Sequence, residues 1–205
     1  VSNIFVLDVQ ISHRLGASHV CFYLDPQTNG IMSNIHFDRV SFTNGLSHIT
    51  SDYTSGSNYV KDLWITNCVM NTATSYGLSF EDVPGPKING NVFAGANAGI
   101  RLNAQGTVAW GNYEVMDNRL VNGVVQDINV TTAGATFTPT IHNTVKILGN
   151  KLWLGTISVQ DVNDLTIENN TLFDGVMAVT YSANATSAYD LRIHKNTITG
   201  GTIPI

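Results

Sequence analysis

Apolar and polar residues alternate along most of this chain with a period of two, and the alternation recurs as a nine-residue phrase. In its clearest copy, residues 164–172, apolar side chains stand at Leu165, Ile167 and Leu172, and Asn170 lies between the second and the third. An alternation of this kind predicts β-strands, and helical spacing is absent. The other copies, two close and two looser, are residues 144–152, 190–198, 112–120 and 85–93.

The second apolar residue of each phrase serves as a marker that recurs eight times at intervals of 20 to 32 residues. Regular recurrence with variable insertions is the signature of a solenoid. Stacking one such unit on the next predicts an all-β fold, a parallel β-helix solenoid of about eight coils. The markers are Val6, Phe37, Ile65, Ile88, Val115, Ile147, Ile167 and Ile193.

The asparagine of the phrase predicts a second column. A stacked side-chain amide can donate to the coil on one side and accept from the coil on the other, and asparagine tolerates the left-handed backbone of a tight turn. We therefore expect an asparagine ladder along the solenoid, with small buried residues taking its place at Val9, Val40 and Cys68 in the first three copies. The ladder residues are Asn91, Asn118, Asn150, Asn170 and Asn196.

Glycine supplies a third column, five positions after the asparagine column, at the start of another alternating segment. At these positions we expect a bend that residues with a Cβ would resist. The glycines concerned are Gly45, Gly123, Gly155, Gly175 and Gly201.

Composition limits the class of protein and its partners. The length of 205 residues suits a single domain, residues 1–205, and only 12% of the residues are charged. The net charge of −5 gives no basic surface for nucleic acid or an anionic membrane, and no apolar run is long enough to cross a bilayer. Because the first residues already match the repeat and the last stop inside a strand-like pattern, we expect a fragment of a longer chain.

The two cysteines, Cys21 and Cys68, fall two repeats apart and in different parts of the repeat. Since stacked strands lie about 4.8 Å apart, two repeats place these residues roughly 10 Å apart, too far for a disulfide. We expect buried free thiols.

The asparagine-bearing coils resemble the right-handed parallel β-helices of the pectate-lyase-like superfamily over nearly the whole chain. That superfamily includes pectate lyases, polygalacturonases, epimerases and the trimeric tailspikes of bacteriophages, so the resemblance implies a long carbohydrate polymer as partner. The polygalacturonase motifs Asn-Thr-Asp, Asp-Asp and Gly-His-Gly are absent; Arg192-Ile193-His194-Lys195 approaches only the fourth, Arg-Ile-Lys. The lyase calcium site needs several carboxylates on one outer face. The residues between the first two apolar positions of each phrase are predicted to point outward, and Glu114 is the only carboxylate among them. We predict no metal site and no cofactor.

The outward position between the two first apolar residues of each phrase forms that column, and it holds candidate carbohydrate-binding residues. His36 and Trp64 are a possible sugar platform, although burial against a loop or a subunit would explain them equally well. Lys87 and Glu114 suit a cross-strand ion pair, either as a solvated charge ladder or as part of a groove that grips a polymer. The whole column reads Phe5, His36, Trp64, Lys87, Glu114, Lys146, Thr166 and Arg192.

A second outer face carries the catalytic candidates. Glycoside hydrolysis uses two carboxylates roughly 5–9 Å apart. Glu81 and Asp82 follow an inner strand, where only one of them can point outward, and Arg101 lies one coil further on. Asp127 and Asp161 follow comparable strands in later coils, so the set could also serve only turns and solubility.

These features favour a tailspike-like β-helix that binds a bacterial surface polysaccharide and hydrolyses it if the carboxylates pair, located on a virion tail or outside the cell. Two alternatives stay open: a secreted monomeric polysaccharide lyase, hydrolase or epimerase, and a non-enzymatic fibre or adhesin segment. A homotrimer is expected because outward apolar residues would suit burial between three rods. They are Phe5, Leu7, Val69, Met116 and Leu148.

Overall fold

The computed structural model describes most of the chain, and every regular element within the described residues is a β-strand. Successive strands pass from one sheet to a second and a third before returning to the first, and every pairing between strands is parallel. The described residues are 1–13, 19–26, 30–51, 59–81, 83–95, 99–103, 112–121, 128–131, 144–160, 162, 164–180 and 190–201.

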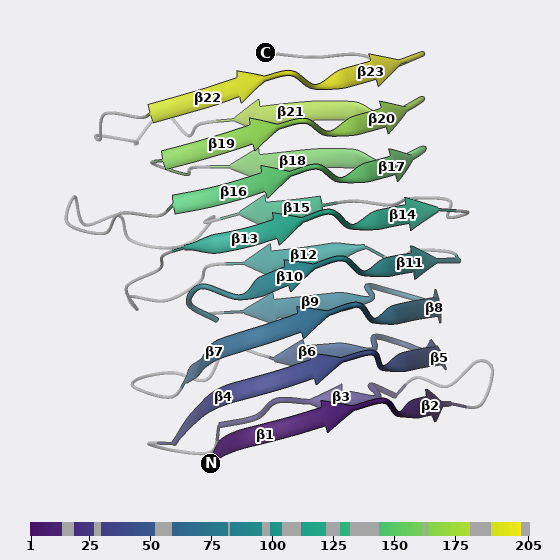
Figure 1. Cartoon of the computed structure of the whole chain (residues 1–205), viewed down its shortest axis with the longest axis vertical. Helices are drawn as coiled ribbons and strands as arrows, with labels where there is room; N and C mark the ends of the chain where they lie inside the picture. Colours follow the sequence, from purple (N-terminus) through teal and green to yellow (C-terminus); the bar gives the residue numbers. More distant parts are fainter. Residues whose placement is uncertain are drawn as a thin grey trace.

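Three parallel sheets run along one common axis, and each takes one strand from successive coils. β1 lies at one end of the axis, and β22 and β23 lie at the other (Figure 1). Sheet A holds eight strands: β1 (Ser2–Leu7), β4 (Ile31–Asp38), β7 (Tyr59–Thr66), β10 (Lys87–Asn89), β13 (Tyr113–Met116), β16 (Thr144–Leu148), β19 (Asp164–Glu168) and β22 (Asp190–His194). Sheet B also holds eight: β2 (Gln10–Ser12), β5 (Ser41–Gly45), β8 (Val69–Ala73), β11 (Val92–Ala94), β14 (Arg119–Val121), β17 (Lys151–Trp153), β20 (Thr171–Phe173) and β23 (Thr197–Thr199). Sheet C lies behind them with seven: β3 (Phe22–Tyr23), β6 (Ile49–Ser51), β9 (Leu78–Glu81), β12 (Ile100–Asn103), β15 (Ile128–Thr131), β18 (Thr156–Gln160) and β21 (Val176–Thr180). This arrangement is consistent with a parallel β-helix.

The marker residues of the phrase form one continuous column inside sheet A. Each marker pairs with the next, from Val6 opposite Phe37 to Ile167 opposite Ile193. The six markers between the two ends are at most 1% exposed, so the hydrophobic effect holds successive coils together at this position. The predicted stacking of the markers is confirmed.

A series of buried asparagine amides runs along the corner between sheets A and B. The Nδ2 atom of Asn118 donates to Oδ1 of Asn150 at 3.0 Å, and Asn150 donates in the same way to Asn170. Asn91 and Asn170 continue the series to Asn118 and Asn196. Each Nδ2 atom also donates to a backbone carbonyl of the preceding coil, as Asn150 does to Val115 at 2.8 Å.

The left-handed residue of this corner stands one position before the asparagine. Asn169, with φ of 58°, precedes Asn170, and the asparagines of the series themselves have no positive φ. The expectation that the asparagine tolerates the left-handed backbone was therefore wrong by one residue. The amide is needed for its hydrogen bonds, and the left-handed position is filled mainly by aspartate, asparagine and glycine. That column is Asp8, Arg39, Asn67, Gly90, Asp117, Gly149, Asn169 and Lys195.

The predicted glycine bends need a different explanation at most positions. Gly45 has φ of 138°, but Gly155, Gly175 and Gly201 have no positive φ. A Cβ on Gly175 would clash with the carbonyl oxygen of Gly155, and one on Gly201 would clash with that of Gly175. Glycine is required here because backbones of successive coils approach closely. Gly123 lies outside the described residues.

The corner before Gly155 offers a stabilising substitution. Leu154 has φ of 58° and is 59% exposed, so an exposed leucine adopts a backbone that costs roughly 1–2 kcal/mol for residues other than glycine and asparagine. We expect Leu154→Asn to raise the free energy of unfolding by about 0.5–1 kcal/mol in urea denaturation. Leu191→Asn, at an exposed strand position without positive φ, is the control; an equal gain there would contradict the explanation.

Candidate functional site

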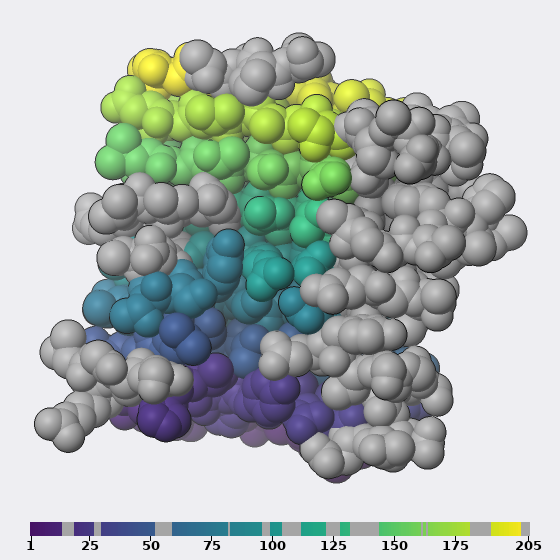
Figure 2. Space-filling model, turned by 180° about the vertical axis from the view of Figure 1, so that it is seen from behind, coloured from purple at the N-terminus to yellow at the C-terminus, as the bar shows by residue number. Residues whose placement is uncertain are grey.

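The outer face of sheet C carries two rows of polar side chains, because alternate residues of each strand point away from the core. Partners in adjacent strands stand in register, so each row runs along the solenoid axis with a step of about 4.8 Å. The first row is Thr50, Ser79, Arg101, Asn129 and Ser158. The second row is Glu81, Asn103, Thr131, Gln160 and Thr180. Figure 2 views the molecule from this side.

Glu81 and Arg101 meet diagonally between the two rows. The Nη2 atom of Arg101 lies 3.5 Å from Oε1 of Glu81, and the side chains are 35% and 17% exposed. The guanidinium carbon of Arg101 also lies 5.9 Å from the centre of the Tyr76 ring. This half-buried pair joins one carboxylate and one cation from adjacent coils, and the adjacency is the one that the stacked repeat predicted.

Most other members of the rows are uncharged. Thr50 and Ser79 are buried, and the Thr50 hydroxyl donates to the Ser79 carbonyl at 2.9 Å. The Thr131 hydroxyl donates to Oε1 of Gln160 at 3.3 Å. The face therefore offers hydroxyl and amide groups at a regular spacing.

The structure describes only one of the carboxylates that were predicted to form a catalytic pair. Glu81 is the only carboxylate within the seven described strands of sheet C. Asp82, Asp127 and Asp161 lie outside the described residues. Glu81 and Arg101 come together, and the second carboxylate stays a prediction.

The outward column of sheet A is in register from Phe5 to Arg192, as the repeat predicted. The rings of Phe5 and His36 stack with centres 4.9 Å apart, and those of His36 and Trp64 stack at 4.3 Å and 8°. Both faces of the His36 ring are thus covered by its neighbours. A sugar approaching this column would meet the ring edges and the outer face of one end ring, so the role of His36 and Trp64 in carbohydrate binding stays a prediction.

Lys87 and Glu114 continue the same column. Their Nζ and Oε2 atoms lie 3.5 Å apart, and the side chains are 39% and 21% exposed. A pair this exposed contributes roughly 0–1 kcal/mol to stability. Its geometry fits the predicted cross-strand pair.

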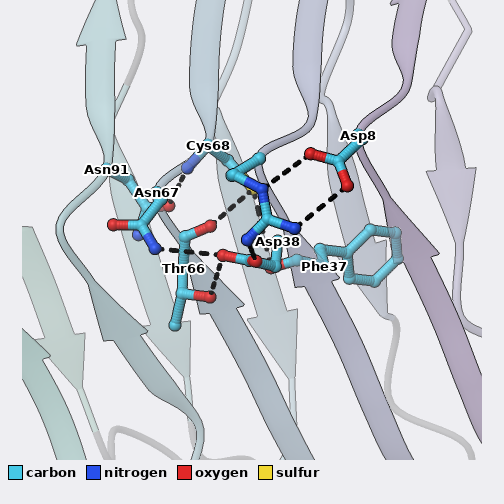
Figure 3. A network of polar contacts seen from close by, with 8 residues as sticks. Asp8, Phe37, Asp38, Thr66, Asn67, Cys68 and Asn91 are labelled. Atoms are coloured by element: carbon cyan, nitrogen blue, oxygen red, sulfur yellow. Dashed lines mark hydrogen bonds and ion pairs between the residues drawn. The ribbon is translucent and has the colours of Figure 1, made fainter.

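Asp38 is the centre of a polar network at the first corner (Figure 3). Its carboxylate accepts hydrogen bonds from the Asn67 amide at 3.0 Å and the Thr66 hydroxyl at 2.8 Å, and these bonds hold the pKa of Asp38 below its usual range. Arg39 donates to Asp38 and, through Nε at 2.6 Å, to Asp8, whose pKa is lowered mainly by that bond. Because donors from the second and third coils converge on carboxylates of the first and second, the network joins three successive coils at this corner.

His48 is a buried titratable residue to which sequence reasoning gave no role. It is 0% exposed, its ring lies 5.5 Å from that of Phe42, and burial lowers its pKa from 6.5 to about 4. Neither ring nitrogen has a hydrogen-bond partner of ordinary geometry, although the nearby Asn71 backbone partly opposes the effect of burial. The sequence signal that could have indicated its burial is the position of His48 directly before the buried strand β6.

Cys68 is a buried free thiol whose Sγ atom donates to the carbonyl of Thr66 at 3.2 Å. Burial is the main cause that raises its pKa to about 11, so this thiol stays protonated and unreactive near neutral pH. Cys21 is also free and half-buried.

Two further observations concern metals and membranes. Among the described residues, no group of three or more histidine, cysteine, aspartate or glutamate side chains is placed to hold a metal ion. The described ranges also contain no helix with the length and apolarity that spanning a bilayer requires.

Compared with known protein families, curated proteins and solved structures, the chain matches none of them. We therefore infer function from the side chains that the three sheets present.

Proposed function

We propose that this chain is a right-handed parallel β-helix of eight coils, with an asparagine ladder, that binds a bacterial surface polysaccharide on the outer face of sheet C. In this proposal it belongs to a tailspike-like host-recognition protein that acts on a virion tail or outside the cell. The observation that carries the proposal is the pair of in-register polar rows on sheet C.

The spacing of these rows supports an elongated ligand. Thr50 and Ser79 of the first row are buried, and from Arg101 to Ser158 the row spans three strands, which is about 10 Å at the spacing of parallel strands. A polymer lying along the axis would meet the guanidinium, amide and hydroxyl groups of Arg101, Asn129 and Ser158 on three successive coils. Few charges and many hydroxyl and amide groups suit a ligand whose own surface consists of hydroxyl groups.

Hydrolysis is the activity that we propose for this face. Glu81 would supply one of the two carboxylates that glycoside hydrolysis uses, with the ion pair to Arg101 orienting it. Asp82, Asp127 and Asp161 are the candidates for its partner.

A homotrimer is the assembly that we propose. Phe5, Leu7 and Val69 are 55%, 44% and 42% exposed, and apolar side chains at that exposure favour burial against other chains. Met116 and Leu148, the other two residues of the predicted interface, are half-buried.

The binding face can be tested by introducing a tryptophan on sheet C in one variant and on sheet A in another. The full chain is screened by affinity electrophoresis against bacterial capsular and O-antigen polysaccharides. Ser158→Trp, on the outer face of sheet C, is expected to weaken binding by about tenfold or more, because the ring blocks the first row. Thr166→Trp, at a half-buried outward position of sheet A, is the matched control and should change binding less than about twofold. Equal losses in both variants, or loss only in Thr166→Trp, would refute the assignment to sheet C.

Hydrolysis is tested separately on the polymer that binds. Glu81→Gln should retain binding and lower the release of reducing ends by about 100-fold or more. Unsaturated products that absorb in the near ultraviolet would instead identify a lyase. Binding without any cleavage by the unmodified chain would leave the binding function and remove the hydrolytic one.

A further inference from the structure

The side chain of Asn103 holds a buried hydrogen-bond acceptor without a donor. Asn103 lies on the outer face of β12 and is 6% exposed, and its Oδ1 atom has no hydrogen-bond partner among the described residues. An acceptor taken from water without a replacement donor is unfavourable in the free protein. Such an atom is a candidate for satisfaction by a ligand.

Two asparagine Oδ1 atoms, those of Asn89 and Asn103, are buried without a partner among the described residues, in contrast to the asparagine series at the corner between sheets A and B. In the buried asparagine series, Oδ1 of Asn150 receives both the backbone N–H and the side-chain amide of Asn118. Oδ1 of Asn118 and Oδ1 of Asn170 each receive the same two bonds. Where asparagine serves this fold, its carbonyl oxygen is thus fully used. Asn103 has a similar burial and a different role.

The neighbours of Asn103 in the second row contribute acceptors. Glu81 stands in register on one side, and its carboxyl group contributes oxygen acceptors. Thr131 stands in register on the other side and donates its hydroxyl to Gln160. A ligand that fits between them has to bring a donor. An amide N–H is such a donor, and its carbonyl can accept from the Asn103 Nδ2 group, so two amides can pair through two parallel hydrogen bonds.

We propose that Asn103 recognises the acetamido group of an N-acetylated amino sugar. This inference rests on the proposed binding of a polysaccharide to sheet C and specifies the class of sugar. Asn103 is a specificity-determining residue in this assignment. A site with a buried acceptor discriminates strongly against a ligand that cannot satisfy it in the same geometry, and a hydroxyl group at the same carbon supplies one bond in place of two.

The probes are chitohexaose and cellohexaose, which share one backbone and differ in carrying an acetamido or a hydroxyl group on each unit. Isothermal titration calorimetry of the full chain should show chitohexaose binding about tenfold or more tightly. Asn103→Leu should abolish that preference without lowering the midpoint of thermal unfolding, since it removes an unsatisfied acceptor. Asn103→Asp, which keeps an acceptor, should retain part of the preference. Asn71→Leu, the same change at an exposed position of sheet B, is the control and should leave the preference unchanged.

Several outcomes would overturn the inference. Equal binding of the two hexasaccharides to the unmodified chain would do so, and so would binding of neither. A large fall in thermal stability of Asn103→Leu would assign the residue to the fold. These failures differ from failure of the proposed function: a polysaccharide from the panel that binds with sensitivity to Ser158→Trp would sustain binding on sheet C even if the acetamido preference is absent.

Discussion

Replacing Asn150 by alanine is expected to lower the free energy of unfolding by about 4 kcal/mol. The substitution removes the acceptor that serves the Asn118 backbone N–H and side-chain amide, both at 3.0 Å. It also removes the donor to the Val115 carbonyl at 2.8 Å and to Oδ1 of Asn170 at 3.0 Å. Because Asn150 is 0% exposed, water does not reach these groups, and each orphaned partner adds to the cost. Urea denaturation followed by circular dichroism measures the change.

The neighbouring Lys151→Ala is a suitable control for this measurement. Lys151 is exposed and its side chain points away from the core, so its loss should change the free energy of unfolding by less than about 0.5 kcal/mol. A loss below about 1 kcal/mol in Asn150→Ala would mean that neighbouring coils relax and re-form the missing hydrogen bonds. In that case the amide series would contribute little to the stability of the solenoid.

The stacking of the coils could be predicted from sequence because one physical requirement repeats in every coil. A marker such as Ile147 must be apolar to fill the interior and must recur once in each circuit to meet Ile167 in register. Repetition turned a weak local pattern into a strong one. The column from Phe5 to Arg192 followed from the same register.

Features that depend on a precise backbone contact could not be read from the pattern. The left-handed residue is Asn169 and not Asn170, which is a difference of one residue within the turn. Gly175 is required by the approach of the Gly155 carbonyl from another coil, and no residue nearby in sequence signals that approach.

The candidate site shows the same division. Alternation placed Glu81 and Arg101 on one face, and the repeat brought them to adjacent coils. The Oδ1 atom of Asn103 is unsatisfied because no donor among the described residues is placed to form a hydrogen bond with it. Whether a donor is so placed depends on the positions of all neighbouring residues in space. His48 is fully buried whereas His194 is exposed, because the place of each histidine in the fold, and not the residue type, decides its burial.

His48 should make the free energy of unfolding depend on pH between about 4 and 6.5, a range in which Asp8 and Asp38 do not. The pKa of His48 is about 4 in the folded chain and 6.5 is its ordinary value, so below about pH 6.5 the unfolded chain binds a proton that the folded chain does not. Stability is therefore lost as the pH falls from about 6.5 toward 4. Asp8 and Asp38 have pKa values lowered from 3.8, so the stability that they contribute is present above 3.8 and is lost only at more acidic pH.

Between about pH 7.5 and about pH 5, the proton taken up by unfolded His48 is expected to cost roughly 2 kcal/mol of unfolding free energy. In His48→Leu this part of the pH dependence should disappear, because leucine does not titrate and leaves no unpaired ring nitrogen beside Phe42. Urea denaturation of both chains at the two pH values gives the comparison, in which the other histidines cancel. An unchanged pH dependence in His48→Leu would mean that folded His48 binds its proton at an ordinary pKa. The coil that contains His48 would then have to open enough to hydrate a charged imidazole, because an imidazolium enclosed against Phe42 without a partner would be strongly unfavourable.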